Sequence, residues 1–216
     1  MQTNNLSTVK YLQTAGICYL IVGAGFLYFG FPFWFLHAVD ENVKEHLVAP
    51  SILLLDVGFT LILKSLNILI TSIALFAGAY SLYKAGEPTG TGSKRNFIFV
   101  SFAGAVCYFL SNWMILPFAP LGAFLNALGM LLISFAGFKT KVWSGWRRYT
   151  PLLAGIFPFV FMFPLVIITK TRPAFMIGFW GIPWILLGIA AWQRSKEISL
   201  SIIKVVTTSH SATTHF

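Results

Sequence analysis

Apolar residues fill the chain in a series of long segments that short polar stretches separate. A helix needs about 20 apolar residues to cross a bilayer, and most of these segments are about that long or longer. The pattern therefore predicts an all-α fold, a polytopic transmembrane helix bundle with six spans. The predicted spans are 11–39, 65–83, 97–116, 121–138, 151–168 and 174–192.

The apolar run from Leu47 to Tyr83 is too long for a single perpendicular crossing. As one helix it would measure about 55 Å, against a hydrocarbon core of about 30 Å. In one interpretation it crosses once, and residues 50–63 form a re-entrant or interfacial helix before the span. In the alternative it crosses twice with a tight turn at 64–67, which gives seven spans. Neither glycine nor proline marks such a turn, so the pattern favours six.

Glycines punctuate the first predicted span at Gly16, Gly23, Gly25 and Gly30. Small residues at such positions let the backbones of neighbouring membrane helices approach closely. We therefore expect this span to pack tightly against another helix.

Prolines punctuate the fifth predicted span at Pro151, Pro158 and Pro164. A proline inside a helix removes a backbone hydrogen bond and bends the helix. We expect a kinked span, and cavity lining is a further hypothesis because freed carbonyls need new partners.

Composition supports the membrane assignment, since 57% of the residues are hydrophobic and only 10% are charged. The formal net charge is +9, and the basic residues lie in short groups between the spans rather than on a soluble face. This argues against nucleic acid as a partner and fits the positive-inside rule. The prediction is an integral protein of the inner or plasma membrane, with the C-terminus in the cytoplasm. It divides into a polar N-terminal segment 1–10, a single transmembrane domain 11–192 and a cytoplasmic tail 193–216.

Asp56 is the residue that a membrane-length segment accommodates least easily. An ionised carboxylate at the bilayer centre costs about 2.5–3.5 kcal/mol on insertion scales, so such residues often have a function. With Thr60, Lys64, Asn67 and Thr71 it follows spacings of four, four, three and four, which place all five on one helix face. The functional hypothesis is a proton- or cation-coupled site or a general acid. The alternative is an anchor at headgroup level.

Three asparagines are the other uncharged polar residues of note inside the spans, namely Asn67, Asn112 and Asn126. We expect them to hydrogen-bond between helices, and ligand binding is the second interpretation. The candidate binding or coupling residues are therefore Asp56, Thr60, Lys64, Asn67, Asn112 and Asn126.

The sequence contains no HExxH motif, no GxSxG motif and no Walker loop, which are typical of metalloproteases, serine hydrolases and nucleotide-binding proteins. Cys18 and Cys107 both lie in apolar segments and are interpreted as packing residues, and no metal or cofactor is predicted. The first functional hypothesis is a non-enzymatic membrane protein, transporter-like or a subunit of a membrane assembly. The alternative is an intramembrane enzyme that acts on a lipid-like or isoprenoid substrate with Asp56 as general acid. Expected partners are lipids, other membrane-protein subunits or a hydrophobic small molecule.

Overall fold

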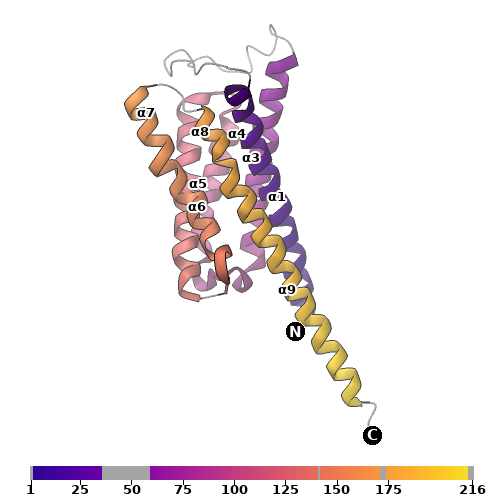
Figure 1. Ribbon diagram of the computed structural model, residues 1–216. Coiled ribbons are helices and arrows are strands. Elements are labelled where there is room, and N and C mark those ends of the chain that lie inside the picture. Colours follow the sequence, from indigo (N-terminus) through magenta and orange to yellow (C-terminus); the bar gives the residue numbers. More distant parts are fainter. Residues whose placement is uncertain (1, 36–58, 141, 171–173, 214–216) are drawn as a thin grey trace.

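The computed structural model describes residues 2–35, 59–140, 142–170 and 174–213 (Figure 1). All regular secondary structure in these residues is helical, which confirms the predicted all-α bundle. The longer helices are α1 (Gln2–Phe35), α3 (Phe59–Ala85), α4 (Ile98–Leu110), α5 (Ile115–Thr140), α6 (Thr150–Phe157), α7 (Phe163–Thr169), α8 (Ala174–Phe179) and α9 (Gly181–Thr213). Short helical turns are η2 (Glu87–Thr89), η3 (Gly92–Phe97), η4 (Gly145–Tyr149) and the π-helical η5 (Pro158–Met162).

Five helical segments among the described residues are long and apolar enough to cross a membrane. The shorter α4 continues the turn η3 and runs beside them in the same bundle (Figure 1). The chain is therefore a multi-pass membrane protein whose described part contains six helical passes. The five long apolar segments are Leu6–Gly30, Leu66–Ala85, Pro117–Phe138, Gly145–Thr169 and Phe175–Lys204.

The six passes pack in a closed ring. Along the chain, α1 packs on α3, α3 on α4, α4 on α5 and α5 on α6, and then α9 contacts both α6 and α1. Large buried side chains fill the interior of this ring, and Tyr19, Trp180 and Trp184 have no exposed surface. The core is therefore a column of bulky residues around which the helices stand.

The continuity of α3 corrects the predicted boundary at Lys64. The helix begins at Phe59 and runs unbroken through Lys64 and Asn67, so the tight turn required by the seven-span alternative is absent. Residues 59–63, assigned to a separate interfacial helix, belong to α3 as well. The rest of that predicted helix, residues 50–58, lies outside the described residues. Propensity explains the correction, because Leu, Ile and Lys favour a helix and nothing in the sequence breaks it.

The boundary between the next two passes also differs from the prediction. The helix α4 ends at Leu110 rather than Leu116, and α5 begins at Ile115 rather than Leu121. Polar side chains at the end of α4 compete for its last carbonyls. The hydroxyl of Ser111 donates to the Tyr108 carbonyl at 2.6 Å, and the Asn112 amide donates to the Phe109 carbonyl at 3.0 Å.

Reciprocal glycine contacts join α1 to α9, which run antiparallel. A Cβ added to Gly23 would lie 2.6 Å from the Gly181 carbonyl oxygen, and one added to Gly188 would lie 2.8 Å from the Gly16 carbonyl oxygen. The two contacts, Gly23 with Gly181 and Gly16 with Gly188, are seven residues apart on each helix, which is about two helical turns. The close backbone approach predicted from the glycines of the first span is confirmed at these positions.

The proline-rich pass is irregular where the sequence predicts it. A π-helical turn, η5, joins α6 to α7, and the N–H of Phe163 donates to the Pro158 carbonyl five residues before it. No side chain of α7 is buried, and this helix leans away from α8 at its end of the bundle (Figure 1).

Candidate functional site

Asp56, the residue singled out most strongly by the sequence, lies outside the described residues. Its role as an acid or a coupling group therefore stays a prediction. Thr60 and Lys64 belong to α3, but only their backbone is described.

The part of the polar face that is described packs against α1. The amide of Asn67 donates to the Gly25 carbonyl at 3.0 Å, and Thr71 is buried against the same glycine. A side chain at Gly25 would overlap the Thr71 hydroxyl. The shared face predicted for Asn67 and Thr71 is confirmed, and both residues contribute to the contact between two helices.

Asn126 joins α5 to α4, as its position in a span predicts. Its side chain is fully buried, its amide donates to the Gly122 carbonyl at 2.9 Å, and its amide oxygen accepts a 2.9 Å hydrogen bond from the Ser101 hydroxyl. Gly104 and Gly129 allow this approach, because a side chain at either would overlap Asn126 or Ser101. Asn112, by contrast, makes the local bond at the end of α4 described above.

We expect Ser101→Ala and Asn126→Ala to be coupled in their effects on stability. Each replacement alone should lower the free energy of unfolding, and the coupling term should be about 0.6 kcal/mol, the average for such bonds in membranes. A double-mutant cycle measured by unfolding in detergent micelles tests this. Strictly additive effects would show that the two side chains do not stabilise the α4–α5 contact together.

An aromatic cluster lies in the interior of the ring. Tyr19 and Trp184 have ring centroids 5.4 Å apart, Trp180 lies 5.6 Å from Trp184, and Phe26 lies 4.9 Å from Trp180. These residues come from α1, from α9 and from the link that joins α8 to α9. The cluster therefore joins α1 to the last pass in the interior of the bundle.

A hydrogen bond from Trp180 also joins the last pass to α6. Its indole N–H donates to the Ala154 carbonyl at 2.7 Å. Pro158 lies four residues after Ala154 and has no N–H to donate to that carbonyl. The tryptophan thus supplies the donor that the proline removes.

Two polar atoms of the aromatic cluster have no hydrogen-bond partner among the described residues. They are the Tyr19 hydroxyl and the Trp184 indole nitrogen, and both are buried. Buried groups of this kind are normally paired, so each marks a place where a water or another polar group would be stabilised.

A small cavity lies between the aromatic cluster and the end of the ring at which the termini lie. Its volume is about 20 Å³, and five of the six passes contribute to its wall. The lining residues are Leu82, Thr89, Thr91, Ile98, Met130, Ile133, Ser134, Gly137, Trp143, Arg148, Pro151 and Leu187.

The loop between α3 and α4 forms part of the wall of this cavity through Thr89 and Thr91. Its backbone turns at Gly86 and Gly90, which have φ angles of 68° and 78° that favour glycine. The indole of Trp143 donates to the Thr89 carbonyl at 2.6 Å, and the Thr140 hydroxyl donates to the Gly90 carbonyl at 2.8 Å. The loop is therefore fixed to the end of α5 and to the segment that follows.

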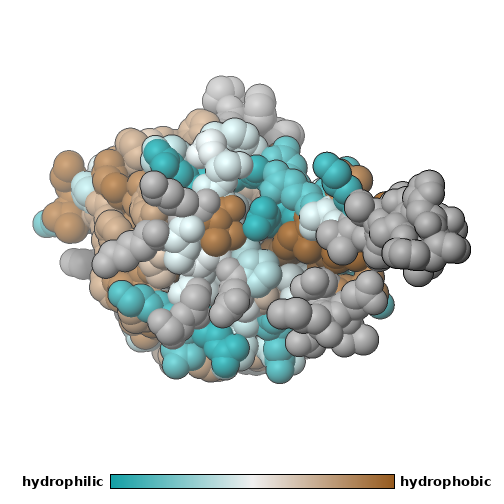
Figure 2. Space-filling view, turned by 90° about the horizontal axis from the view of Figure 1, so that it is seen from below, coloured by the Kyte–Doolittle hydropathy of each residue, from teal (hydrophilic) through white to brown (hydrophobic). Residues whose placement is uncertain are grey.

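Basic residues gather at this end of the bundle. Figure 2, seen from that end, shows hydrophilic residues over the face and apolar ones along the flank. Arg147 of η4 and Arg194 of α9 both pair with Glu197, at 2.6 Å and 3.0 Å, and this clamps η4 to α9. The basic residues of this end include Lys10, Lys84, Lys94, Arg95, Lys139, Arg147, Arg148, Arg194 and Lys196.

No group of three or more His, Cys, Asp or Glu side chains is placed to hold a metal ion in the described part of the chain. Sequence reasoning missed the aromatic cluster and the cavity. Trp180 and Trp184 offered a signal, because tryptophans inside a span, away from the interface, need a partner for their N–H. Comparisons with protein-family models, curated proteins and solved structures found no match to this chain.

Proposed function

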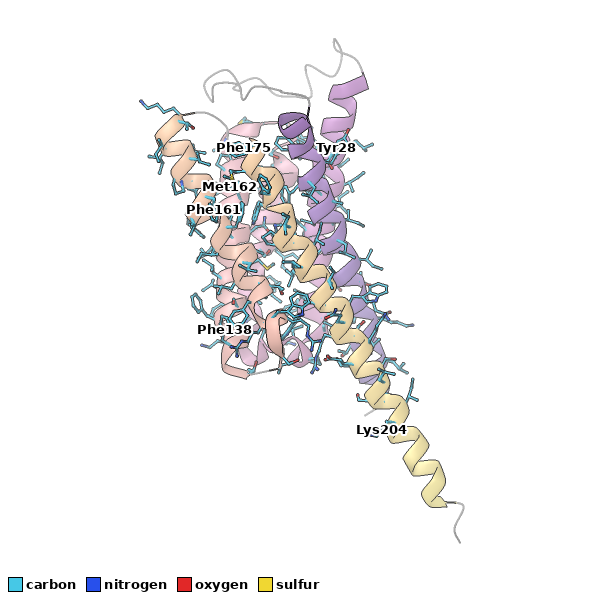
Figure 3. All side chains as sticks on the ribbon, in the orientation of Figure 1. Tyr28, Phe138, Phe161, Met162, Phe175 and Lys204 are labelled. Carbon is cyan, nitrogen blue, oxygen red and sulfur yellow. The ribbon has the colours of Figure 1, made fainter. Side chains whose placement is uncertain are left out.

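We propose that the protein is a non-enzymatic helical subunit of a membrane assembly, which binds its partner through the projecting part of α9. The observation that carries this proposal is the length of that helix. Its 33 residues measure about 50 Å, and it continues well beyond the other helices of the bundle, with Lys204 on the projecting part (Figures 1 and 3).

The surface of this projection supports a protein partner. Leu200 lies three residues after Glu197, whose ion pair with Arg147 marks the end of the bundle, and its side chain is 66% exposed. Ile203, on the same face one turn further along, is 59% exposed, and two such apolar side chains give a partner helix a surface to pack against. The polar side chains inside the bundle, Asn67 and Asn126, are already used in helix packing.

The proposed orientation places the projection in the cytoplasm. Most basic residues of the described chain lie on or beside the helix ends from which α9 projects, and Lys170 follows α7, whose last turn lies at the opposite end (Figure 1). The positive-inside rule assigns the basic end to the cytoplasmic side. A partner with a soluble or peripheral part on that side is therefore proposed.

We expect Leu200→Glu to remove a stoichiometric protein partner that co-purifies with the wild-type chain in native lipid nanodiscs. The charge would be placed against the apolar surface of the partner, where it is costly to bury. Mass spectrometry of the purified discs measures the loss. Ser201→Glu is the matched control, since Ser201 is also exposed and lies one residue further along.

Retention of the partner by the Leu200→Glu variant would contradict the proposed docking surface. Loss of the partner from both variants would point to a general effect of negative charge on this helix instead.

A transporter-like protein is the second candidate function. The closed ring, its small cavity and the unpaired polar atoms of Tyr19 and Trp184 favour it, because a path for a polar solute needs such atoms in the interior. Reconstituted vesicles that contain the chain alone and conduct a small solute would support this function over the assembly role.

A further inference from the structure

We propose that the cavity between the aromatic cluster and the α3–α4 loop binds one ordered water molecule, held by the hydroxyl groups of Ser134 and Thr91. This site goes beyond the assembly role and does not depend on it. Ser134 lies on α5 and lines the cavity.

Ser134 differs from other serines of the bundle. Its side chain is 2% exposed, and its hydroxyl has no hydrogen-bond partner among the described residues. A serine inside a helix commonly donates to a carbonyl one turn before it, as Ser72 does to Leu69 and Ser195 does to Trp192. The Ser134 hydroxyl makes no such bond, and it lines a cavity. A polar partner inside the cavity would satisfy this hydroxyl.

Thr91 offers the second polar group. The Thr89 hydroxyl donates to the Gly86 carbonyl at 2.6 Å, so the proton in the 2.8 Å contact between the two threonine hydroxyls comes from Thr91. This leaves the Thr91 oxygen with a lone pair that can accept a further hydrogen bond. A water that accepts from Ser134 and donates to Thr91 satisfies both residues.

The size of the cavity selects water as the ligand. A volume of about 20 Å³ exceeds the roughly 10–15 Å³ that one water needs, and two polar partners meet the minimum for a buried water. Arg148 lines the same cavity and disfavours a cation. The walls formed by Leu82, Ile98 and Met130 are apolar, so they offer nothing to hold a larger polar ligand.

The sign of the stability change in Ser134→Ala tests the site. If a water is bound, the replacement removes one of its partners, and the unfolding midpoint in detergent should fall below that of the wild type, as it does when a bonded hydroxyl is removed. If the cavity is dry, the replacement removes a buried unpaired hydroxyl, and the midpoint should rise above that of the wild type. That second outcome would overturn the proposal.

Ser72→Ala is the matched control, because Ser72 is also 2% exposed and helical but its hydroxyl is bonded within its own helix. It reports the effect of the same chemical change without a cavity. A density map of the wild-type protein that resolves ordered waters gives a second test. One peak within hydrogen-bonding distance of both Ser134 and Thr91 is expected, and an empty cavity would contradict the site.

Discussion

Gly181→Ala should lower the free energy of unfolding by about 3 kcal/mol, at the upper end of the range for an overpacked core. The added methyl group would overlap the Gly23 carbonyl oxygen and would lie 3.0 Å from the Leu27 nitrogen. Both of these atoms belong to the backbone of α1. Relief therefore requires α1 and α9 to move apart along their whole contact, because no rotamer change of one side chain removes the overlap.

Gly137→Ala is the matched control for this experiment. Gly137 also lies in a membrane helix, but a Cβ added there meets nothing within 4 Å. Alanine has the higher helix propensity, so this variant should be as stable as the wild type or more stable by up to about 1 kcal/mol. Both variants can be unfolded in the same detergent. Equal stability of the two would show that the α1–α9 contact tolerates a wider spacing.

Trp180→Phe should lower the free energy of unfolding by about 1–3 kcal/mol, the cost of leaving a buried polar group without its partner. Phenylalanine keeps an aromatic ring in the interior but removes the N–H that donates to the Ala154 carbonyl. Trp180→Ala should cost more, about 3–5 kcal/mol, because it also leaves a cavity at a fully buried position. Unfolding in detergent measures both.

A second replacement separates the hydrogen bond from packing in this experiment. In a Pro158→Ala background, the new backbone N–H can donate to the Ala154 carbonyl, so Trp180→Phe should cost less than it does in the wild type. An unchanged cost in that background would show that Trp180 stabilises the contact through its ring alone.

Much of the architecture follows from local properties of the sequence. The length of the apolar segments predicts the six passes, the glycines of the first span predict a close helix contact, and Asn126 inside a span predicts an interhelical hydrogen bond. These features depend on the character of individual residues in a bilayer, which a sequence displays directly.

The features that were missed depend on residues far apart in the chain. Trp180 donates to the Ala154 carbonyl, and Trp143 donates to the Thr89 carbonyl beside the cavity. Predicting either bond requires knowledge of which helices are neighbours. Boundaries were missed for a different reason. Lys64 looks like an interface residue, yet the helix propensity of the residues around it carries α3 past that point. The role of Asp56 lies beyond the described residues.

The pairing of α1 with α9 has a consequence for biosynthesis. A ribosome produces α1 before every other helix of the bundle and α9 after them, yet these two share the glycine contacts that close the ring. The face of α1 that carries Gly16 and Gly23 must therefore stay covered by lipid or by a chaperone until the final span has been translated. The ring therefore closes only after its last helix has been made, and a chain stalled before Gly181 would lack the helix that covers this face of α1.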